Sequence, residues 1–364
     1  MRVQTFSRSL GWPANGHPLA FLAITLAISV AASAQVTQFF TWQGDNNNNW
    51  QNSANWGQTP GSGDVPDATN HQVRFDDTAN RLNVDLNNND RTVGKITFDL
   101  ASNVSYLIRS SSQNGIVRNF GDLVSPDAHN VAFDASISYF QDSDGVWTLN
   151  TNPAYMVFNC AVGGAFGNSI TLDGGVTLGA ANTFSGDFLI TSGATAVLGN
   201  DLSLQNANVW IESGGTLDLL LNGVSPKFMT LRGPGGFNLP VGATLTVGGT
   251  VFASPNTYSG VIVSGASSTL TKLGGATWQL SASNMFPGTI NIDAGAIRPT
   301  LSDTLALATV SINTNNGLTL PAAVDATLGG LAGSGNLNIG ATTTHILKVP
   351  RRGEEALVDH EHAM

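Results

Sequence analysis

The chain has 364 residues, a formal net charge of −10, one cysteine and only 11% charged residues. Its four Glu and four Lys are too few to fill exposed helix faces, which argues against a helical protein. Asn, Thr, Ser, Gly and Val dominate, a composition typical of strands and turns. The acidic balance supplies no basic face for nucleic acid, so we expect no nucleic-acid partner.

The first 34 residues are predicted to be a signal peptide. Arg2 and Arg8 supply a positive flank, residues 19–31 form an apolar run, and the small residues at 32–34 form a cleavage site. The run is shorter than the roughly 20 apolar residues of a membrane helix, and no later stretch reaches that length. We therefore predict a secreted or cell-surface protein cleaved after Ala34, with no transmembrane helix in the mature chain. The alternative is an uncleaved anchor.

Residues 35–64 form a predicted N-terminal cap rich in Trp and Asn. Trp42, Trp50 and Trp56 lie among Gly, Asn and Asp residues, which favour loops over helix. We interpret the segment as an aromatic cap over the open end of a repeat stack, because repeat arrays need atypical terminal units. The alternative interpretation is an exposed platform of rings that binds the faces of sugars.

Short alternating segments begin at residue 65. Residues 82–86, for example, alternate strictly between apolar and polar side chains before a run of Asn breaks the pattern. Strands of about five residues at this spacing are compatible with a sandwich or a solenoid. Cys160 has apolar neighbours and no second cysteine, so we predict a small buried hydrophobe and not a reactive thiol.

Residues 161–344 carry the clearest repeat pattern. An Asn-x-Phe/Tyr-x-Gly signature begins at Asn182, Asn256 and Asn284, and a short apolar run and a Gly turn follow each copy. A unit this short cannot bury its own apolar face, so it must stack on copies of itself. We therefore predict an all-β fold, a right-handed parallel β-helix (β-solenoid) over residues 65–344. It would have about ten to twelve coils of roughly 22–28 residues, with the signatures at equivalent corners of neighbouring coils.

Residues 345–364 form a predicted irregular, disordered tail. The segment holds three of the four Glu and shows no strand alternation. His360 and His362, next to Asp359 and Glu361, could bind a metal only weakly, because nothing on a loose terminus orients the ligands. We predict no metal site there.

The order of these motifs resembles the autotransporter-associated β-strand repeat. The best copy is residues 270–295, which begin L-T-K-L-G, continue with W-Q-L-S and end at an Ala-Gly turn; residues 328–337 resemble half a copy, and residues 41–44 the usual start. The resemblance implies a parallel β-helix passenger, exported and displayed at or released from the surface of a Gram-negative-type cell. The family usually adds a C-terminal translocator barrel, and nothing after residue 300 resembles the alternating strands of about ten residues that a barrel needs.

No pattern predicts an enzyme, and we assign no catalytic, cofactor-binding or metal residue. His71 and His129 are interpreted as surface or turn residues, and Ser143 lacks the G-x-S-x-G elbow of a nucleophile. Two acidic groups supply oxygens of the kind calcium prefers. The first group is Asp64, Asp67, Asp76 and Asp77, and the second is Asp142 with Asp144. The spacing of these residues differs from that of an EF-hand, and Asp is common in turns, so we expect no bound cofactor.

Two functional hypotheses follow. The first is an exported non-enzymatic passenger with a structural or adhesive role at the cell surface or in the extracellular matrix, with glycans or cell-surface components as partners. The alternative is a polysaccharide-binding or polysaccharide-degrading protein on a β-helix scaffold, which would gather Asp, Arg or Lys in one groove. Basic residues are sparse after residue 161 and denser upstream, at Arg74, Arg81, Arg91, Lys95, Arg109 and Arg118.

Overall fold

The computed structural model describes residues 37–59, 64–100, 104–112, 114–164, 167–219, 223–248, 256–322, 324–339 and 346–349. The chain divides into two units, Met1–Gln35 and Val36–Met364, and every described residue belongs to the second unit. The predicted signal peptide and the His360/His362 pair therefore lie outside the described residues. No described helix is long and apolar enough to cross a membrane.

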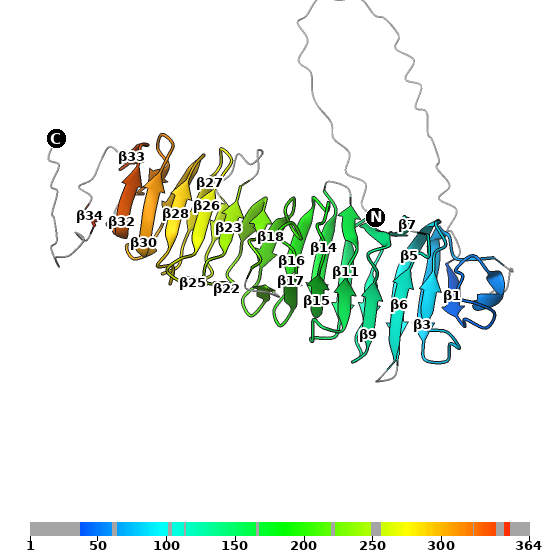
Figure 1. Ribbon diagram of the computed structural model, residues 1–364. Helices are drawn as coiled ribbons and strands as arrows, with labels where there is room; N and C mark the ends of the chain where they lie inside the picture. Colours follow the sequence, from blue (N-terminus) through cyan, green and yellow to red (C-terminus); the bar gives the residue numbers. More distant parts are fainter. Residues whose placement is uncertain are drawn as a thin grey trace, which may run out of the picture. The chain divides into compact units, whose positions relative to one another are not determined.

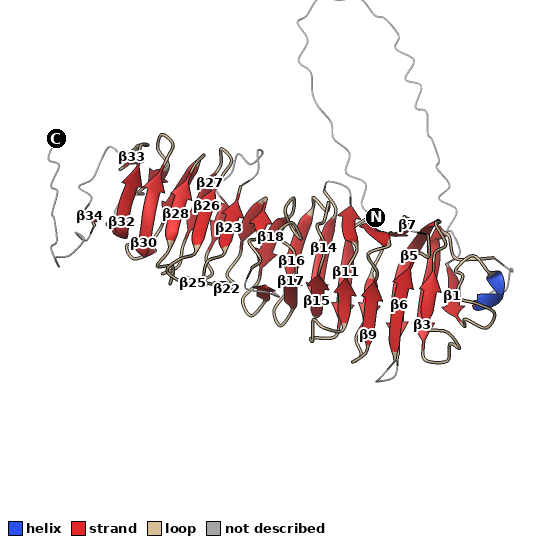
Figure 2. Ribbon diagram, in the orientation of Figure 1, coloured by secondary structure: helices blue, strands red, loops and turns tan. Residues whose placement is uncertain are grey.

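Four sheets account for almost all regular structure in the described residues, and the 3-10 turn η1 (Ser53–Asn55) is the one helical segment among them (Figure 2). The first sheet contains β1 (Gln38–Trp42), β2 (Trp56–Thr59), β3 (Ala68–Asp76), β5 (Asp90–Asp99), β7 (Gly115–Asn119), β8 (Leu123–Ser125), β10 (Ile137–Gln141), β11 (Gly145–Leu149), β13 (Ala161–Gly164), β14 (Ser169–Asp173), β16 (Asp187–Ile190), β18 (Asn208–Ile211) and β21 (Thr230–Arg232). The second sheet contains β4 (Asn83–Asp85), β6 (Ser105–Arg109), β9 (Asn130–Phe133), β12 (Met156–Phe158), β15 (Gly175–Leu178), β17 (Thr195–Leu198), β19 (Thr216–Leu219), β22 (Phe237–Leu239) and β25 (Ile262–Ser264).

The other two sheets belong to the later part of the chain. The third contains β20 (Lys227–Phe228), β23 (Thr244–Val247), β26 (Thr269–Lys272), β28 (Thr289–Ile292), β30 (Leu305–Ile312), β32 (Ala326–Gly333) and β34 (Leu347–Lys348). The fourth contains β24 (Asn256–Tyr258), β27 (Thr277–Leu280), β29 (Ala296–Pro299), β31 (Leu318–Thr319) and β33 (Leu337–Asn338). Because β34 pairs with β32, strand pairing continues past the predicted boundary at residue 344.

The strands stack in chain order as successive coils of a solenoid (Figure 1). Every ladder between described strands is parallel except the one between β1 and β2. From β3 onward, paired residues lie between 18 positions apart, as in Ile170 with Phe188, and 27 apart, as in Ile96 with Leu123. The result is a β-solenoid of about 12 turns, which confirms the predicted fold class.

Each coil passes over three faces, as β10, β11 and β12 illustrate. The long strand β5 shows how the first sheet covers two of them: its residues 90–93 pair with β7, whereas Ile96 and Thr97 pair with β8. Gly94 lies at this bend, where an added Cβ would be 2.0 Å from the backbone oxygen of Thr69 in the preceding coil. The fourth sheet extends the β8–β21 side of the first sheet, because Gly233, next to β21, bridges to Tyr258 in β24.

The core consists of side chains that repeat at the same position in successive coils. Phe75 and Phe98 are in register, and their rings stack with centroids 4.9 Å apart. Phe133 and Phe158 are likewise in register and stack at 4.5 Å. These separations match the strand spacing of about 4.8 Å, so an aromatic residue in one coil shields the ring of the next.

The N-terminal tryptophans are part of this core. Trp42, Trp50 and Trp56 are all buried, and the centroid of Trp56 lies 5.0 Å from that of Trp42 and 4.8 Å from that of Trp50. Each indole N–H donates to a backbone oxygen, at distances of 2.7, 3.0 and 2.8 Å for Trp42, Trp50 and Trp56. These three rings therefore offer no exposed platform for a sugar, and they pack where β2 pairs with β1 at the edge of the first sheet.

The signature glycines make the predicted corners. The signature aromatics Phe184, Tyr258 and Phe286 are all buried. A Cβ on Gly186, Gly260 or Gly288 would lie 1.7, 1.8 or 2.1 Å from a backbone oxygen of the preceding coil. Glycine is therefore required at these corners because there is no room for a side chain beneath the adjacent coil.

The prediction that the signatures mark equivalent corners of neighbouring coils is wrong. Asn256 lies in β24 and is in register with Trp278, so one coil here is 22 residues long, and Asn284 lies on the next face. The strands that follow the three signatures, β16, β25 and β28, belong to three different sheets. The reason is that all three corners of a coil have the same steric requirement, so the same local motif serves each of them.

Candidate functional site

The acidic residues grouped by the sequence do not form a metal site. Asp67 pairs with Arg91 at 3.0 Å and accepts the Thr92 N–H at 2.9 Å, whereas Asp76 accepts the N–H and hydroxyl of Thr78. The side chains of Asp64 and Asp77 take part in neither of these arrangements. Among the described residues no group of three or more His, Cys, Asp or Glu side chains could hold a metal ion.

Aspartates instead link each coil to its neighbour. Asp142 pairs with Arg118 at 2.9 Å, and Asp144 accepts the N–H of Ser169 at 2.7 Å, 25 positions later. Similar links to a backbone N–H one coil away come from Asp85, Asp122, Asp201 and Asp325. Sequence reasoning missed this role, although the sequence carries a signal for some of these links: Asp122, Asp144 and Asp325 each lie directly before a strand and about one coil before the residue that they bind.

The described histidines, His71 and His129, do not form a nucleophile site with Ser143. His129 lies in the loop between β8 and β9, but it is buried, not at the surface, and its Nε2 lies 2.8 Å from the Ser125 hydroxyl. Burial lowers the pKa of His129, and both members of this pair are closed to a substrate. His71 is half-buried, with its Nδ1 accepting the Asp67 N–H at 2.9 Å. The Ser143 hydroxyl donates to the backbone oxygen of Phe120 at 2.6 Å.

Cys160 behaves as the sequence predicts. Its side chain is buried and free of disulfide bonds, and burial raises the pKa of the thiol to about 12. A thiol that stays protonated at neutral pH is a poor nucleophile.

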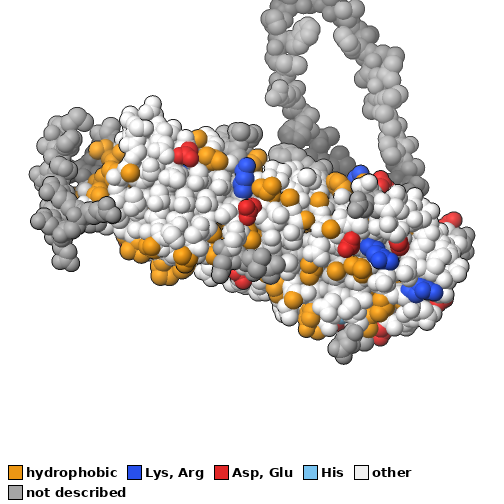
Figure 3. Space-filling view, in the orientation of Figure 1, with side chains coloured by type: hydrophobic (Ala, Val, Ile, Leu, Met, Phe, Trp, Pro, Cys, Tyr) orange, Lys and Arg blue, Asp and Glu red, His pale blue; other side chains and the backbone are white. Residues whose placement is uncertain are grey.

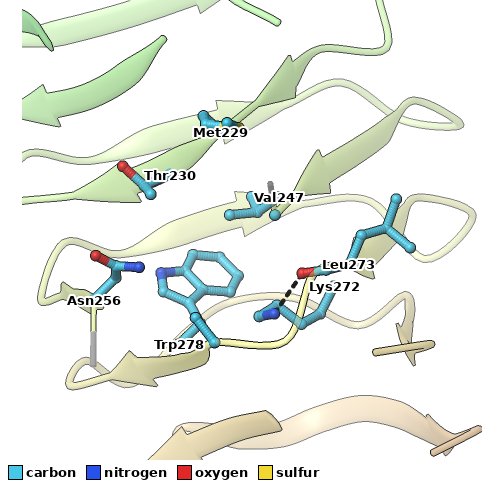
Figure 4. A pocket seen from close by; sticks show the side chains of 9 residues that line it. Met229, Thr230, Val247, Asn256, Lys272, Leu273 and Trp278 are labelled. Carbon is cyan, nitrogen blue, oxygen red and sulfur yellow. Dashed lines mark hydrogen bonds between the residues drawn. The ribbon is translucent and has the colours of Figure 1, made fainter. Parts of the chain in front are cut away.

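Lys272 is a buried cation held by carbonyl groups and not by a carboxylate (Figure 4). Its ammonium donates to the backbone oxygens of Leu273, Gly274 and Ala294, at 2.5, 2.8 and 3.3 Å. The cavity beside it, next to Trp278, has a volume of about 10 Å³, which is room for one water molecule and no larger ligand. Lys272 therefore fastens a corner between two coils, and burial lowers its pKa to about 8.

Raising the pH from 8 to 10.5 is expected to stabilise the folded chain relative to a Lys272→Met variant. The pKa of Lys272 is about 8 in the folded chain and 10.5 when unperturbed. Between these values the unfolded chain keeps a proton that the folded chain has released, so the free energy of unfolding rises with pH across this window. Urea denaturation of both proteins across the window measures the difference. Parallel pH profiles would show that the three carbonyls keep Lys272 protonated.

The outer surface of the first sheet carries the candidate site. The register aligns one outward-facing residue per coil along a single column: Phe39, Gln72, Lys95, Asp122, Val146, Thr171, Leu189, Trp210 and Arg232. Three apolar members are well exposed, with Phe39 at 54%, Val146 at 42% and Trp210 at 40%. Charged side chains are few on the face of the molecule that Figure 3 shows.

The arginines on this sheet already have partners. Arg74 pairs with Asp99 at 2.5 Å, Arg118 with Asp142 at 2.9 Å, and Arg232 with Asp187 at 3.6 Å. Arg118 also lies over the ring of Phe140, and Arg232 over that of Trp210. Lys95 differs, because no carboxylate oxygen of the described residues lies within 4.0 Å of its ammonium.

A groove lies over β1, β3 and β5 at the N-terminal end of this sheet. It encloses about 370 Å³, and its lining includes the outward side chains of Phe39, Thr41, Gln72, Arg74, Lys95 and Asp99. We call it the N-terminal groove. It brings three charged side chains and one exposed ring together from strands up to 60 residues apart in sequence. Such convergence is what the polysaccharide hypothesis expects.

The fold and this site together define a β-solenoid with a groove of ligand size on the outer surface of its first sheet. Comparison with known proteins adds no family: no protein-family model, no curated protein and no solved structure matches the chain.

Proposed function

We propose that the protein is an exported, non-enzymatic β-solenoid passenger with a structural or adhesive role at the cell surface or in the extracellular matrix. One observation carries this proposal. Many carboxylates of the described residues link neighbouring coils or pair with a single arginine, as Asp144 and Asp142 do. The shape and surface of the stack, and not a reactive centre, are then its contribution.

Two features from the sequence support export and display. The predicted signal peptide at residues 1–34 would direct the chain out of the cytoplasm. The motifs at residues 270–295 resemble the autotransporter-associated β-strand repeat, whose members are exported passengers. The buried Cys160 is compatible with an oxidising compartment, because it cannot form an internal disulfide.

Cell fractionation tests the export part of the proposal. The full chain is expressed in a Gram-negative host, and we expect the mature protein, beginning at Gln35, in the medium or accessible to protease on intact cells. Protein confined to the cytoplasm with residues 1–34 intact would contradict export.

An activity assay tests the non-enzymatic part. Purified mature protein is incubated with pectin-like and alginate-like polymers, and we expect no new reducing ends and no unsaturated oligosaccharides. In parallel, binding to intact cells and to isolated matrix is measured, and retention is expected. Release of oligosaccharides would establish an enzyme and overturn this part.

A specific observation favours polysaccharide binding as a second candidate. The N-terminal groove combines the exposed ring of Phe39 with Arg74, Lys95 and Asp99. Binding is favoured over degradation, because Asp99 is the one carboxylate among the described groove residues, whereas glycoside hydrolysis uses two.

A further inference from the structure

We propose that the N-terminal groove is a binding site for a saccharide that carries a carboxylate, a hexuronate unit of an acidic polysaccharide. The inference rests on the proposed adhesive function and names its ligand class and its site. It follows from three properties of the groove: an ammonium with no ion-pair partner among the described residues, an exposed ring two strands away from it, and a polar pair directed at the solvent.

The charge of Lys95 selects for an anion. The lining contains two cations, Arg74 and Lys95, and one anion, Asp99. Asp99 forms an ion pair with Arg74 at 2.5 Å, and the ammonium of Lys95 has no carboxylate partner among the described residues. An anionic ligand supplies that partner, and a charge-assisted hydrogen bond to a carboxylate is stronger than one to a neutral hydroxyl.

Phe39 supplies the apolar surface that a sugar ring requires. Its side chain is 54% exposed and lies in the same register column as Gln72 and Lys95. The C–H face of a pyranose packs on an aromatic plane while its hydroxyls remain at the polar rim. A large exposed ring two strands from a cation, with Gln72 between them, therefore fits a ligand with both an apolar face and a charge.

The remaining side chains match the hydroxyls of such a ring. Arg74 and Asp99 are each about half exposed, at 51% and 55%, so their outer edges remain available to a ligand. Thr41, Arg74 and Thr97 are in register on β1, β3 and β5, which places donors and acceptors on three paired strands. The volume of about 370 Å³ lies at the small end of the roughly 300–1,000 Å³ typical of ligand pockets.

The other exposed aromatic of the same column, Trp210, is a weaker candidate. Arg232 lies over its ring at 5.8 Å and also pairs with Asp187 at 3.6 Å. Asp187 in turn accepts from Asn208 at 2.9 Å. The guanidinium of Arg232 already has a carboxylate partner, so the described residues leave no unpaired cation beside Trp210 to select a charged ligand.

The test compares two polymers with the same sugar backbone, one with free carboxylates and one in which each carboxylate is a neutral methyl ester. Binding of the mature protein to polygalacturonate and to its fully methyl-esterified form is measured by calorimetry at low ionic strength. We expect the esterified polymer to bind about five- to tenfold more weakly, because it lacks the partner of Lys95. Added salt should weaken binding to the charged polymer and leave the ester unaffected.

Two variants locate the site. Lys95→Met keeps the length of the side chain and removes its charge, and it should lower affinity for polygalacturonate about five- to tenfold. Phe39→Ala should weaken binding of both polymers. Lys227→Met is the matched control, because Lys227 is an exposed lysine on β20 outside the groove, and it should bind like the unsubstituted protein. Circular dichroism and urea midpoints confirm that each variant is folded.

The outcomes separate this inference from the function on which it rests. Equal binding of the two polymers, or unchanged binding by Lys95→Met, overturns the inference of a carboxylate site. If polygalacturonate does not bind but the protein is retained on cells, the groove inference fails and the adhesive function stands. If the protein is also not retained on cells or matrix, the adhesive function fails.

Discussion

Replacing Gly186 by alanine is expected to lower the free energy of unfolding by about 3 kcal/mol or more. The added Cβ would lie 1.7 Å from the backbone oxygen of Asn168. That oxygen accepts the N–H of Asp187 at 3.1 Å, the first link between β16 and the coil beneath it. The substitution must therefore move the backbone of one coil and break this bond, since no flexible side chain can yield.

Gly275→Ala is the matched control for this prediction. No atom lies within 4 Å of a Cβ at Gly275, and its backbone does not need a positive φ. Alanine there should leave stability almost unchanged. Urea unfolding followed by circular dichroism compares the two variants; equal midpoints would show that the solenoid does not require a bare backbone at the signature corner.

Replacing Asn182 by leucine should cost roughly 2–6 kcal/mol, because it leaves two buried backbone groups without partners at about 1–3 kcal/mol each. The Asn182 side chain is buried and accepts the N–H of Val162, one coil back, at 2.7 Å. It also donates to the oxygen of Ser203, one coil ahead, at 2.7 Å. One amide thus joins three consecutive coils where they have no regular ladder.

Two further substitutions sharpen this prediction. Asn182→Asp keeps the acceptor for Val162 but loses the donor to Ser203, so its cost should be intermediate. Asn130→Leu is the control, because Asn130 is exposed on β9 and leucine suits a strand there. Asn284 should behave like Asn182, since it accepts from Ile262 at 2.8 Å and donates to Thr304 at 3.3 Å. If Asn182→Leu were as stable as Asn130→Leu, the bridging role would be wrong.

The sequence predicted the local rules of this fold well. Alternation of apolar and polar residues indicated which side chains face the core, as with Ile290 and Ile292 in β28. The glycine of each signature indicated a corner, and the solitary Cys160 indicated a buried hydrophobe; both predictions are confirmed. These features depend on a residue and its nearest neighbours along the chain, so they can be predicted from the sequence without the tertiary structure.

The sequence did not reveal which residues become neighbours between coils. Asn256 and Asn284 looked like successive copies of one position, yet Trp278 is the residue beside Asn256. Coil length varies between 18 and 27 residues, so a fixed period cannot give the register. Because the register was unknown, the burial of His129 and the hydrogen bond from the Ser169 N–H to Asp144 could not be predicted. Both depend on which residues of the adjacent coil lie next to them.

By itself, therefore, the sequence determined that the chain forms strands and tight glycine corners that must stack. Tertiary structure alone decided that Phe39, Arg74, Lys95 and Asp99 share one groove, and that Lys95 has no carboxylate partner among the described residues. The physical reason is that loop lengths set the parallel register of β1, β3 and β5, and the register decides which side chains meet across coils.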